Sequence, residues 1–227
     1  HPIPVGVREE DAAFCVLGVV ALNGVRLADI RLGEAVVVVG EGVLGQLATQ
    51  FVRLSGAWPV IAVDLSESRL RLSLKHGATH TVSPGPKEVV PAILDLTKGR
   101  MADVAFEVTG NPDVIPSLFR TVRRLGRVVL LGSPRGTTLV DFHDEVHTLG
   151  LHIIGAHNST HTPCATPHNV WTQERDAELF LELLSAGQFS VTDLISHRLP
   201  WQEAPEAYEL LASDRAQTMG VILDWTV

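Results

Sequence analysis

The sequence has few cysteines, few aromatic residues and no long apolar run. Its two cysteines, Cys15 and Cys164, are too few for a disulfide scaffold in a chain of 227 residues, so a reducing, cytoplasmic environment is expected. The longest run without Asp, Glu, Lys, Arg or His, Ala12–Val25, has 14 residues, fewer than the ~20 that span a bilayer. The start of the chain lacks the charged and apolar regions of a targeting peptide. We therefore expect neither a membrane span nor a membrane partner.

The sequence also lacks a basic cluster. It has 18 Lys and Arg against 26 Asp and Glu, a formal net charge of −8, and the basic residues are scattered. Nucleic acid is therefore not an expected partner, and a small molecule is. Hydrophobic residues make up 45% of the chain, enough for a globular core. The first residue is His1 rather than Met, so we interpret the chain as the later part of a longer product.

From residue 35 onward, short β-branched runs alternate with helical patterns, which is typical of parallel βαβ units. The runs are apolar without alternation, so helices should cover both faces of the sheet. The predicted strands are Ala35–Val39, Val60–Val63, Thr81–Val82, Val104–Val108, Val128–Leu131 and His152–Ile154. The predicted helices between them are Leu44–Ser55, Glu67–His76, Val89–Leu96 and Val114–Val122, with Ser66 and Asp113 as N-caps. The expected fold is α/β, a Rossmann-type doubly wound sheet of six parallel strands.

Two flanking segments fall outside this pattern. Residues 10–28 predict one helix. The tail predicts helices over 173–186 and 203–211 and short strands over 196–199 and 221–223. A small strand needs a partner for its backbone groups. We therefore interpret the tail as part of a second domain whose main body precedes His1.

The first predicted strand runs directly into a GxGxxG motif and then into a helical pattern. Gly40 permits the tight turn, Gly42 lets backbone approach a pyrophosphate, and Gly45 allows close helix–strand packing. Asp64 ends the second strand, where a carboxylate accepts hydrogen bonds from adenosine ribose, which favours NAD over NADP. Arg69 could instead pair with a 2′-phosphate, so dual specificity is the alternative. The turns that end the fourth and fifth strands should border the ribose and nicotinamide.

The string VVVVGEGVLGQLATQFVRLSGAWPVIAVDLSESRL, followed by HGATHTV, DVAFEVTG, GRVVLLGSP and LHIIGAH, resembles the medium-chain dehydrogenase/reductase superfamily, within it the zinc-dependent alcohol and polyol dehydrogenases. The stretch LISHRLPWQEAPEAYELLASDRAQTMGVILDW resembles the C-terminal return of that family. The resemblance implies a Rossmann domain inserted into a GroES-like catalytic domain. Residues 1–16 would end the N-terminal catalytic segment, 17–156 would form the NAD-binding domain, and 157–227 would return to the catalytic domain.

The resemblance also implies site residues. The cofactor-binding residues that it implies are Gly40, Gly42, Val43, Leu44, Gly45, Asp64, Arg69, Thr109, Leu131, Gly132 and Ala156. The catalytic residues and most zinc ligands of the family would lie before His1. Cys15 matches the place of a third zinc ligand in alcohol dehydrogenases, although the polyol-type alignment puts Val16 there, and a buried core cysteine is the alternative.

Six of the ten histidines fall between His143 and His168. His157, His161, Cys164 and His168 have no spacing typical of a known zinc site. Because this segment is rich in Pro, Thr, Ser and Asn, a solvated loop is favoured over a metal site. His157 could face a substrate or bond to nearby backbone.

The resemblance implies hydride transfer between an alcohol and NAD, with zinc polarising the substrate oxygen in the full-length protein. This chain alone would bind the cofactor without turnover. The expected assembly is a homodimer or homotetramer, in which the strand over 152–154 at the sheet edge could pair with its copy. One alternative is a zinc-free, NADPH-dependent quinone or enoyl reductase, against which Asp64 counts. Another is a non-catalytic NAD-binding module.

Overall fold

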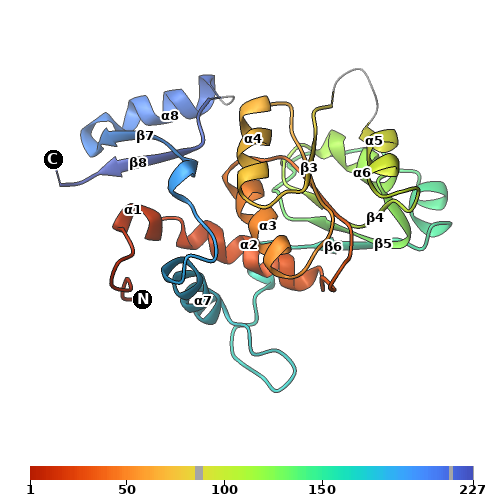
Figure 1. The fold of residues 1–227 in the computed structure, drawn as a ribbon, viewed down its shortest axis with the longest axis horizontal. Coiled ribbons are helices and arrows are strands. Elements are labelled where there is room, and N and C mark those ends of the chain that lie inside the picture. Colours follow the sequence, from red (N-terminus) through yellow and green to blue (C-terminus); the bar gives the residue numbers. More distant parts are fainter. Residues whose placement is uncertain (85–88, 215–216, 227) are drawn as a thin grey trace.

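The computed structural model describes residues 1–84, 89–214 and 217–226. Its centre is a sheet of six parallel strands in the order β3-β2-β1-β4-β5-β6 (Figure 1). The strands are β1 Val36–Val39, β2 Val60–Val63, β3 His80–Val82, β4 Ala102–Glu107, β5 Val122–Leu130 and β6 His152–Gly155. The order reverses direction between β1 and β4, so the chain forms the predicted Rossmann-type, doubly wound sheet.

Helices cover both faces of this sheet because successive strand side chains point to opposite sides. Val36 and Val38 of β1 pack in one cluster with α2 and α3, whereas Val37 packs in another with α5 and α6. The helix α4 joins the α3 side, where Leu70 meets Ala62 of β2. The bounds are α2 Cys15–Leu27, α3 Val43–Leu54, α4 Glu67–Lys75, α5 Val89–Leu96 and α6 Ile115–Phe119.

Three local expectations were wrong. The helix predicted over 10–28 is divided into α1 Glu9–Ala12 and α2. The helix predicted over 114–122 ends at Phe119, because the chain is already in β5 at Val122, paired with Ala102. The N-cap predicted at Asp113 is Asn111, whose side chain accepts a hydrogen bond from the Asp113 N–H ahead of the short 3-10 helix Pro112–Val114.

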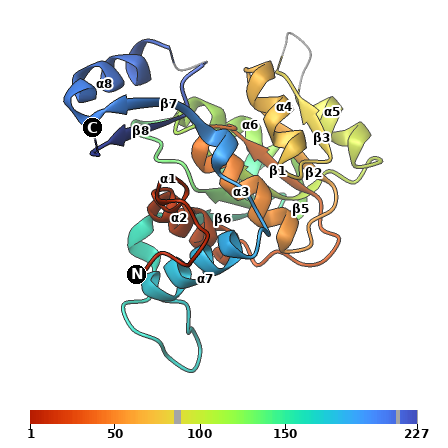
Figure 2. The same cartoon turned by 60° about the vertical axis from the view of Figure 1, so that its left-hand side comes forward.

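The tail divides between the central core and a small outer layer. The helix α7 Gln173–Ser185 packs on α2, and its Phe180 stacks edge-on against Phe51 of α3 at 6.5 Å. The strands β7 Ile195–Pro200 and β8 Gly220–Asp224 pair with each other in parallel, and α8 Ala204–Ser213 lies beside them. Figure 2 shows these three elements apart from the main sheet. The domain boundaries at 16 and 156 stay predictions.

Two further points concern surfaces. Strand β6 forms one edge of the main sheet, as the sequence predicted, and its His152 and Ile153 are exposed. Within the described ranges, no helix has the length and apolar character needed to cross a membrane.

Candidate cofactor site

The loop between β1 and α3 takes its shape from Gly40 and Gly45. Gly40 has φ +98°, and a Cβ there would stand 2.8 Å from the backbone N of Thr109. A Cβ on Gly45 would stand 1.8 Å from the carbonyl O of Gly40. Both positions therefore exclude any side chain, because the loop folds back on itself and against the turn after β4.

Gly42 plays a different part in the same loop. It occupies the N-cap position of α3, and a Cβ built there would meet no atom within 4 Å. The space in front of Gly42 is thus open, and the first turn of α3 has no side-chain cap for its amides. A helix of 12 residues with uncapped N–H donors at its start is suited to a phosphate group.

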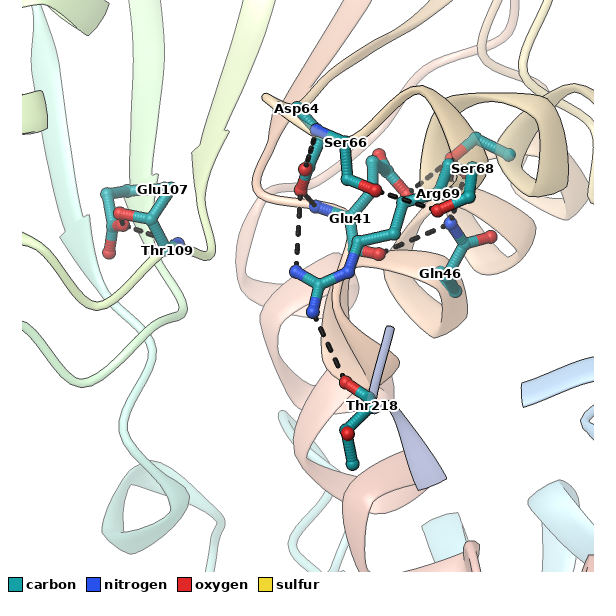
Figure 3. A network of polar contacts seen from close by, with 10 residues as sticks. Glu41, Gln46, Asp64, Ser66, Ser68, Arg69, Glu107, Thr109 and Thr218 are labelled. Atoms are coloured by element: carbon teal, nitrogen blue, oxygen red, sulfur yellow. Dashed lines mark hydrogen bonds and ion pairs between the residues drawn. The ribbon is translucent and has the colours of Figure 1, made fainter. Parts of the chain in front are cut away.

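Asp64 directly follows β2 and lies beside this loop, as Figure 3 shows. Its Oδ2 accepts a hydrogen bond of 2.7 Å from the Glu41 N–H, and its Oδ1 accepts one of 2.8 Å from the Ser66 N–H. Each carboxylate oxygen has a second lone pair for a further donor. Asp64 therefore fixes the loop and the start of α4 while it still presents acceptors to a ligand.

Arg69 on α4 completes this side of the site. Its Nη1 lies 3.9 Å from Asp64 Oδ2, and its Nη2 donates to the carbonyl O of Thr218 at 3.4 Å (Figure 3). Thr218 precedes β8, so the guanidinium links α4 and Asp64, beside the loop between β1 and α3, to the outer layer. The predicted basic residue is thus already engaged by groups of the protein.

Glu41 was not predicted as a site residue, yet the structure places it directly under the loop. Its side chain is fully buried and meets the hydroxyls of Thr49 on α3 and Ser73 on α4, each at 2.9 Å. Burial, together with the nearby charge of Asp64, raises the pKa of Glu41 to about 8, although both hydroxyls lower it. An acidic residue among the apolar residues of the motif was the sequence signal that could have revealed it.

Glu107, also buried, organises the turn after β4. Its Oε1 accepts hydrogen bonds from the N–H and Oγ1 of Thr109 and from the N–H of Gly110, at 2.6, 2.5 and 2.8 Å. Its Oε2 would lie 2.6 Å from a Cβ on Gly132, so that position after β5 also requires glycine. Sequence reasoning noted this turn but assigned no role to the carboxylate.

A cavity of about 1020 Å³ lies at the carboxyl ends of β1, β2 and β4, beside the point where the strand order reverses. This is where open α/β sheets bind ligands. The predicted residues that line it are Gly40, Gly42, Asp64, Arg69 and Thr109. A second cavity of about 640 Å³ between α2, α3 and α7 contains no residue predicted for the cofactor site.

The remaining predicted residues do not line the larger cavity. Gly45 packs inside the loop, while Val43 and Leu44 pack in part on the core. Leu131 is buried against Gly24 of α2, and Ala156 is fully buried after β6. Any contact of Leu131 or Ala156 with a cofactor would therefore involve backbone rather than side chains. Whether these residues bind the cofactor stays a prediction.

The described residues do not assemble a zinc site. They contain no group of three or more His, Cys, Asp or Glu placed to hold a metal ion. Cys15 opens α2, half-buried, with Sγ 3.9 Å from the carbonyl O of Ala177, and burial raises the pKa of its thiol. The role of Cys15 as a zinc ligand therefore stays a prediction.

The histidine-rich segment is held by ordinary polar contacts. His157 Nδ1 accepts a hydrogen bond of 3.2 Å from the backbone N–H of Ser159 and lies 2.8 Å from the Ser159 hydroxyl, which agrees with the backbone-bonding alternative, and a substrate contact stays a prediction. The side chain of His161 is 5% exposed, with Nε2 3.4 Å from Asp176 of α7, whereas residues 163–170 are exposed, as expected for a solvated loop. Cys164 and His168 are exposed.

Comparison with known proteins places this Rossmann-type fold in a family. The family model described as zinc-binding dehydrogenase matches residues 43–171, and the chain belongs to that family. The matched part contains α3, Asp64 and the turns after β4 and β5.

Individual relatives agree with this assignment. The chain is 30% identical to L-threonine 3-dehydrogenase of Pyrococcus furiosus over 83% of its length and 51% of that protein. It is 32% identical to D-guloside 3-dehydrogenase of Escherichia coli over 83% of its length and 53% of that protein. A Sinorhizobium meliloti protein assigned to the zinc-binding dehydrogenases and solved with NADP has TM-score 0.83 and 28% identity, over 98% of this chain and 61% of that one. The chain thus spans about half the length of the curated relatives it matches.

Proposed function

We propose that this chain is the cofactor-binding part of an NAD-dependent dehydrogenase that transfers hydride between an alcohol and nicotinamide. One observation carries the proposal: the open face of Gly42 and the carboxylate of Asp64 border the same cavity at the start of α3. This pairing suits a dinucleotide, whose pyrophosphate needs backbone donors and whose ribose needs an acceptor. The alcohol substrates of the two dehydrogenase relatives support the reaction class.

The choice of NAD rests on the charge of Asp64. A 2′-phosphate carries about −1.5 to −2 charge at pH 7. Two unit charges ~4 Å apart repel by ~4 kcal/mol at an effective dielectric of ~20. To offset this repulsion, Arg69 would have to give up its contacts with Asp64 and the Thr218 carbonyl. The Sinorhizobium meliloti relative that was solved with NADP instead favours the alternative cofactor, NADP.

In the proposed complex, each part of the site has a separate task. The amides at the start of α3 would hold the pyrophosphate, Asp64 the adenosine ribose, and the turn around Thr109 the nicotinamide half. When bound, the nicotinamide supplies the hydride acceptor. The residues of this chain would bind and orient it, and the groups that contact the alcohol would come from elsewhere in a complete enzyme, with zinc as the proposed second cofactor.

Titration of the protein with NADH and NADPH tests the proposal. We expect NADH to bind more tightly, and Asp64→Asn to narrow the difference between the two affinities by at least about tenfold, or ~1.4 kcal/mol. Asp64 also supports the loop through Glu41, so the variant should weaken both cofactors; the ratio of the affinities isolates the charge effect. Asp95→Asn, at an exposed position of α5, is the matched control.

The outcomes separate the parts of the proposal. If neither nucleotide binds, the proposed function is wrong. If NADPH binds more tightly, only the NAD assignment is wrong. Oxidation of a panel of alcohols by the zinc-loaded full-length enzyme then tests the reaction, and cofactor binding without turnover in that full-length enzyme would favour a non-catalytic NAD-binding module.

A further inference from the structure

The buried side chain of Glu41 lies in a polar cluster whose hydrogen bonds can be counted. The Ser73 hydroxyl is 2.9 Å from Glu41 Oε2, 2.9 Å from the Arg69 carbonyl O and 2.8 Å from Gln46 Nε2. The carbonyl can only accept and the amide nitrogen of Gln46 can only donate. A hydroxyl has one proton, so Ser73 cannot donate to the carbonyl and to a carboxylate at once.

A proton on Glu41 would allow the Ser73 hydroxyl to donate to the Arg69 carbonyl and at the same time keep its hydrogen bond with Glu41. With Oε2 protonated, Glu41 donates to Ser73, Ser73 donates to the Arg69 carbonyl, and Gln46 donates to Ser73, so that each of the three contacts of the Ser73 hydroxyl has one proton. The Arg69 carbonyl also accepts a hydrogen bond of 3.0 Å from Gln46 Nε2. On the other side, Thr49 donates to Oε1 in either state. The fully buried position and the pKa of about 8 agree with this count.

We propose that Glu41 is a positioning residue that works as a neutral carboxylic acid and joins the cofactor loop, α3 and α4 in the form that binds the dinucleotide. This inference rests on the proposed function, because it concerns the same loop. Glu41 itself does not touch the cofactor: its side chain points beneath the loop, and its own N–H is bonded to Asp64.

The charged and titratable groups around Glu41 do not compensate a negative charge on its side chain. Asp64, at the end of β2, adds negative charge, and its interaction with Glu41 opposes ionisation. Arg69 of α4 is directed at Asp64 and the Thr218 carbonyl. His76, directly after α4, has Nδ1 3.0 Å from Gln46 Oε1, and burial lowers its pKa, although nearby Asp193 raises it. An ionised Glu41 would therefore add an uncompensated negative charge under a loop that is to receive an anionic pyrophosphate.

Proton linkage makes the proposal measurable. If the dinucleotide binds only the form with neutral Glu41, NADH affinity falls about tenfold for each pH unit above the pKa of this group. By the same linkage, NADH binding near pH 8 takes up protons from solution.

The experiment measures NADH affinity by titration calorimetry from pH 6.5 to 9.5, in two buffers with different ionisation enthalpies. We expect the wild-type chain and the control Glu178→Gln, exposed on α7, to lose affinity above pH 8 and to take up protons on binding. Glu41→Gln, whose uncharged amide resembles the neutral acid in shape and can donate to Ser73, should show neither effect. If wild type and Glu41→Gln share one pH profile, the proposal is overturned.

Infrared spectroscopy of the free wild-type chain needs neither a variant that folds nor a bound cofactor. At pH 6.5 it should show a protonated carboxylic acid band that disappears as pH rises through about 8 and is missing in Glu41→Gln. If the band is missing from wild type, the proposal is wrong even when NADH binds. If the band is present and NADH does not bind at any pH, the neutral acid is real but the proposed function and the positioning role that depends on it both fail.

Discussion

The replacement of Glu41 by Gln has a stability consequence that follows from the same buried proton. An unfolded Glu titrates near its ordinary value of 4.5, whereas folded Glu41 titrates at about 8. Its favourable contribution is thus fully present below pH 4.5 and is lost as pH rises towards 8, because only the unfolded state releases the proton in between.

The expected slope is about 1.4 kcal/mol per pH unit, the free energy of one proton. Between pH 5.5 and 7.5, the wild-type chain should therefore lose about 2.7 kcal/mol of unfolding free energy relative to Glu41→Gln. Glutamine does not titrate, while the other groups of the protein are the same in both chains. The difference between the two curves thus isolates Glu41.

Urea unfolding followed by circular dichroism at pH 5.5, 6.5 and 7.5 gives this difference, with comparable m-values as the condition for the comparison. The control Glu178→Gln, at an exposed position, should follow the wild-type curve. Parallel curves for wild type and Glu41→Gln would refute the reasoning, because they would mean that Glu41 is ionised in the folded chain at pH 5.5.

Three further predictions concern other residues. Gly45→Ala should lower the unfolding free energy by about 1–3 kcal/mol, because its Cβ would meet the Gly40 carbonyl; Gly42→Ala, with open space around its Cβ, should keep stability and weaken NADH binding by about tenfold, ~1.4 kcal/mol. Equal losses of stability in Gly45→Ala and Gly42→Ala would contradict the assignment of Gly45 to loop packing and of Gly42 to the cofactor-facing side. Asp176→Ala should cost about 3 kcal/mol in urea unfolding, since it leaves Arg26 without its buried partner at 2.8 Å; a loss below ~1 kcal/mol would count against a buried ion pair. Cys15→Ser in the full-length, zinc-loaded protein should reduce zinc content by metal analysis, and full retention of zinc would assign Cys15 to the core.

Much of the fold could be predicted from local patterns. The apolar runs of β1, β2 and β4 and the motif from Gly40 to Gly45 lie where the sequence placed them. The errors came where a pattern was weak. The segment around Val122 reads as the end of a helix, but pairing with Ala102 makes it a strand, because a ladder of long-range hydrogen bonds outweighs a modest local preference.

The sequence by itself determined the βαβ order, the nucleotide loop and the acidic residue at the end of β2, because each depends on residues that are neighbours along the chain. Only the tertiary structure decided that Asp64 bonds to the Glu41 amide, that Arg69 reaches the Thr218 carbonyl, and that Glu41 is buried between α3 and α4. Desolvation and hydrogen bonding depend on groups brought together from distant positions, so no local pattern can show whether a carboxyl group is solvated and charged or buried and neutral.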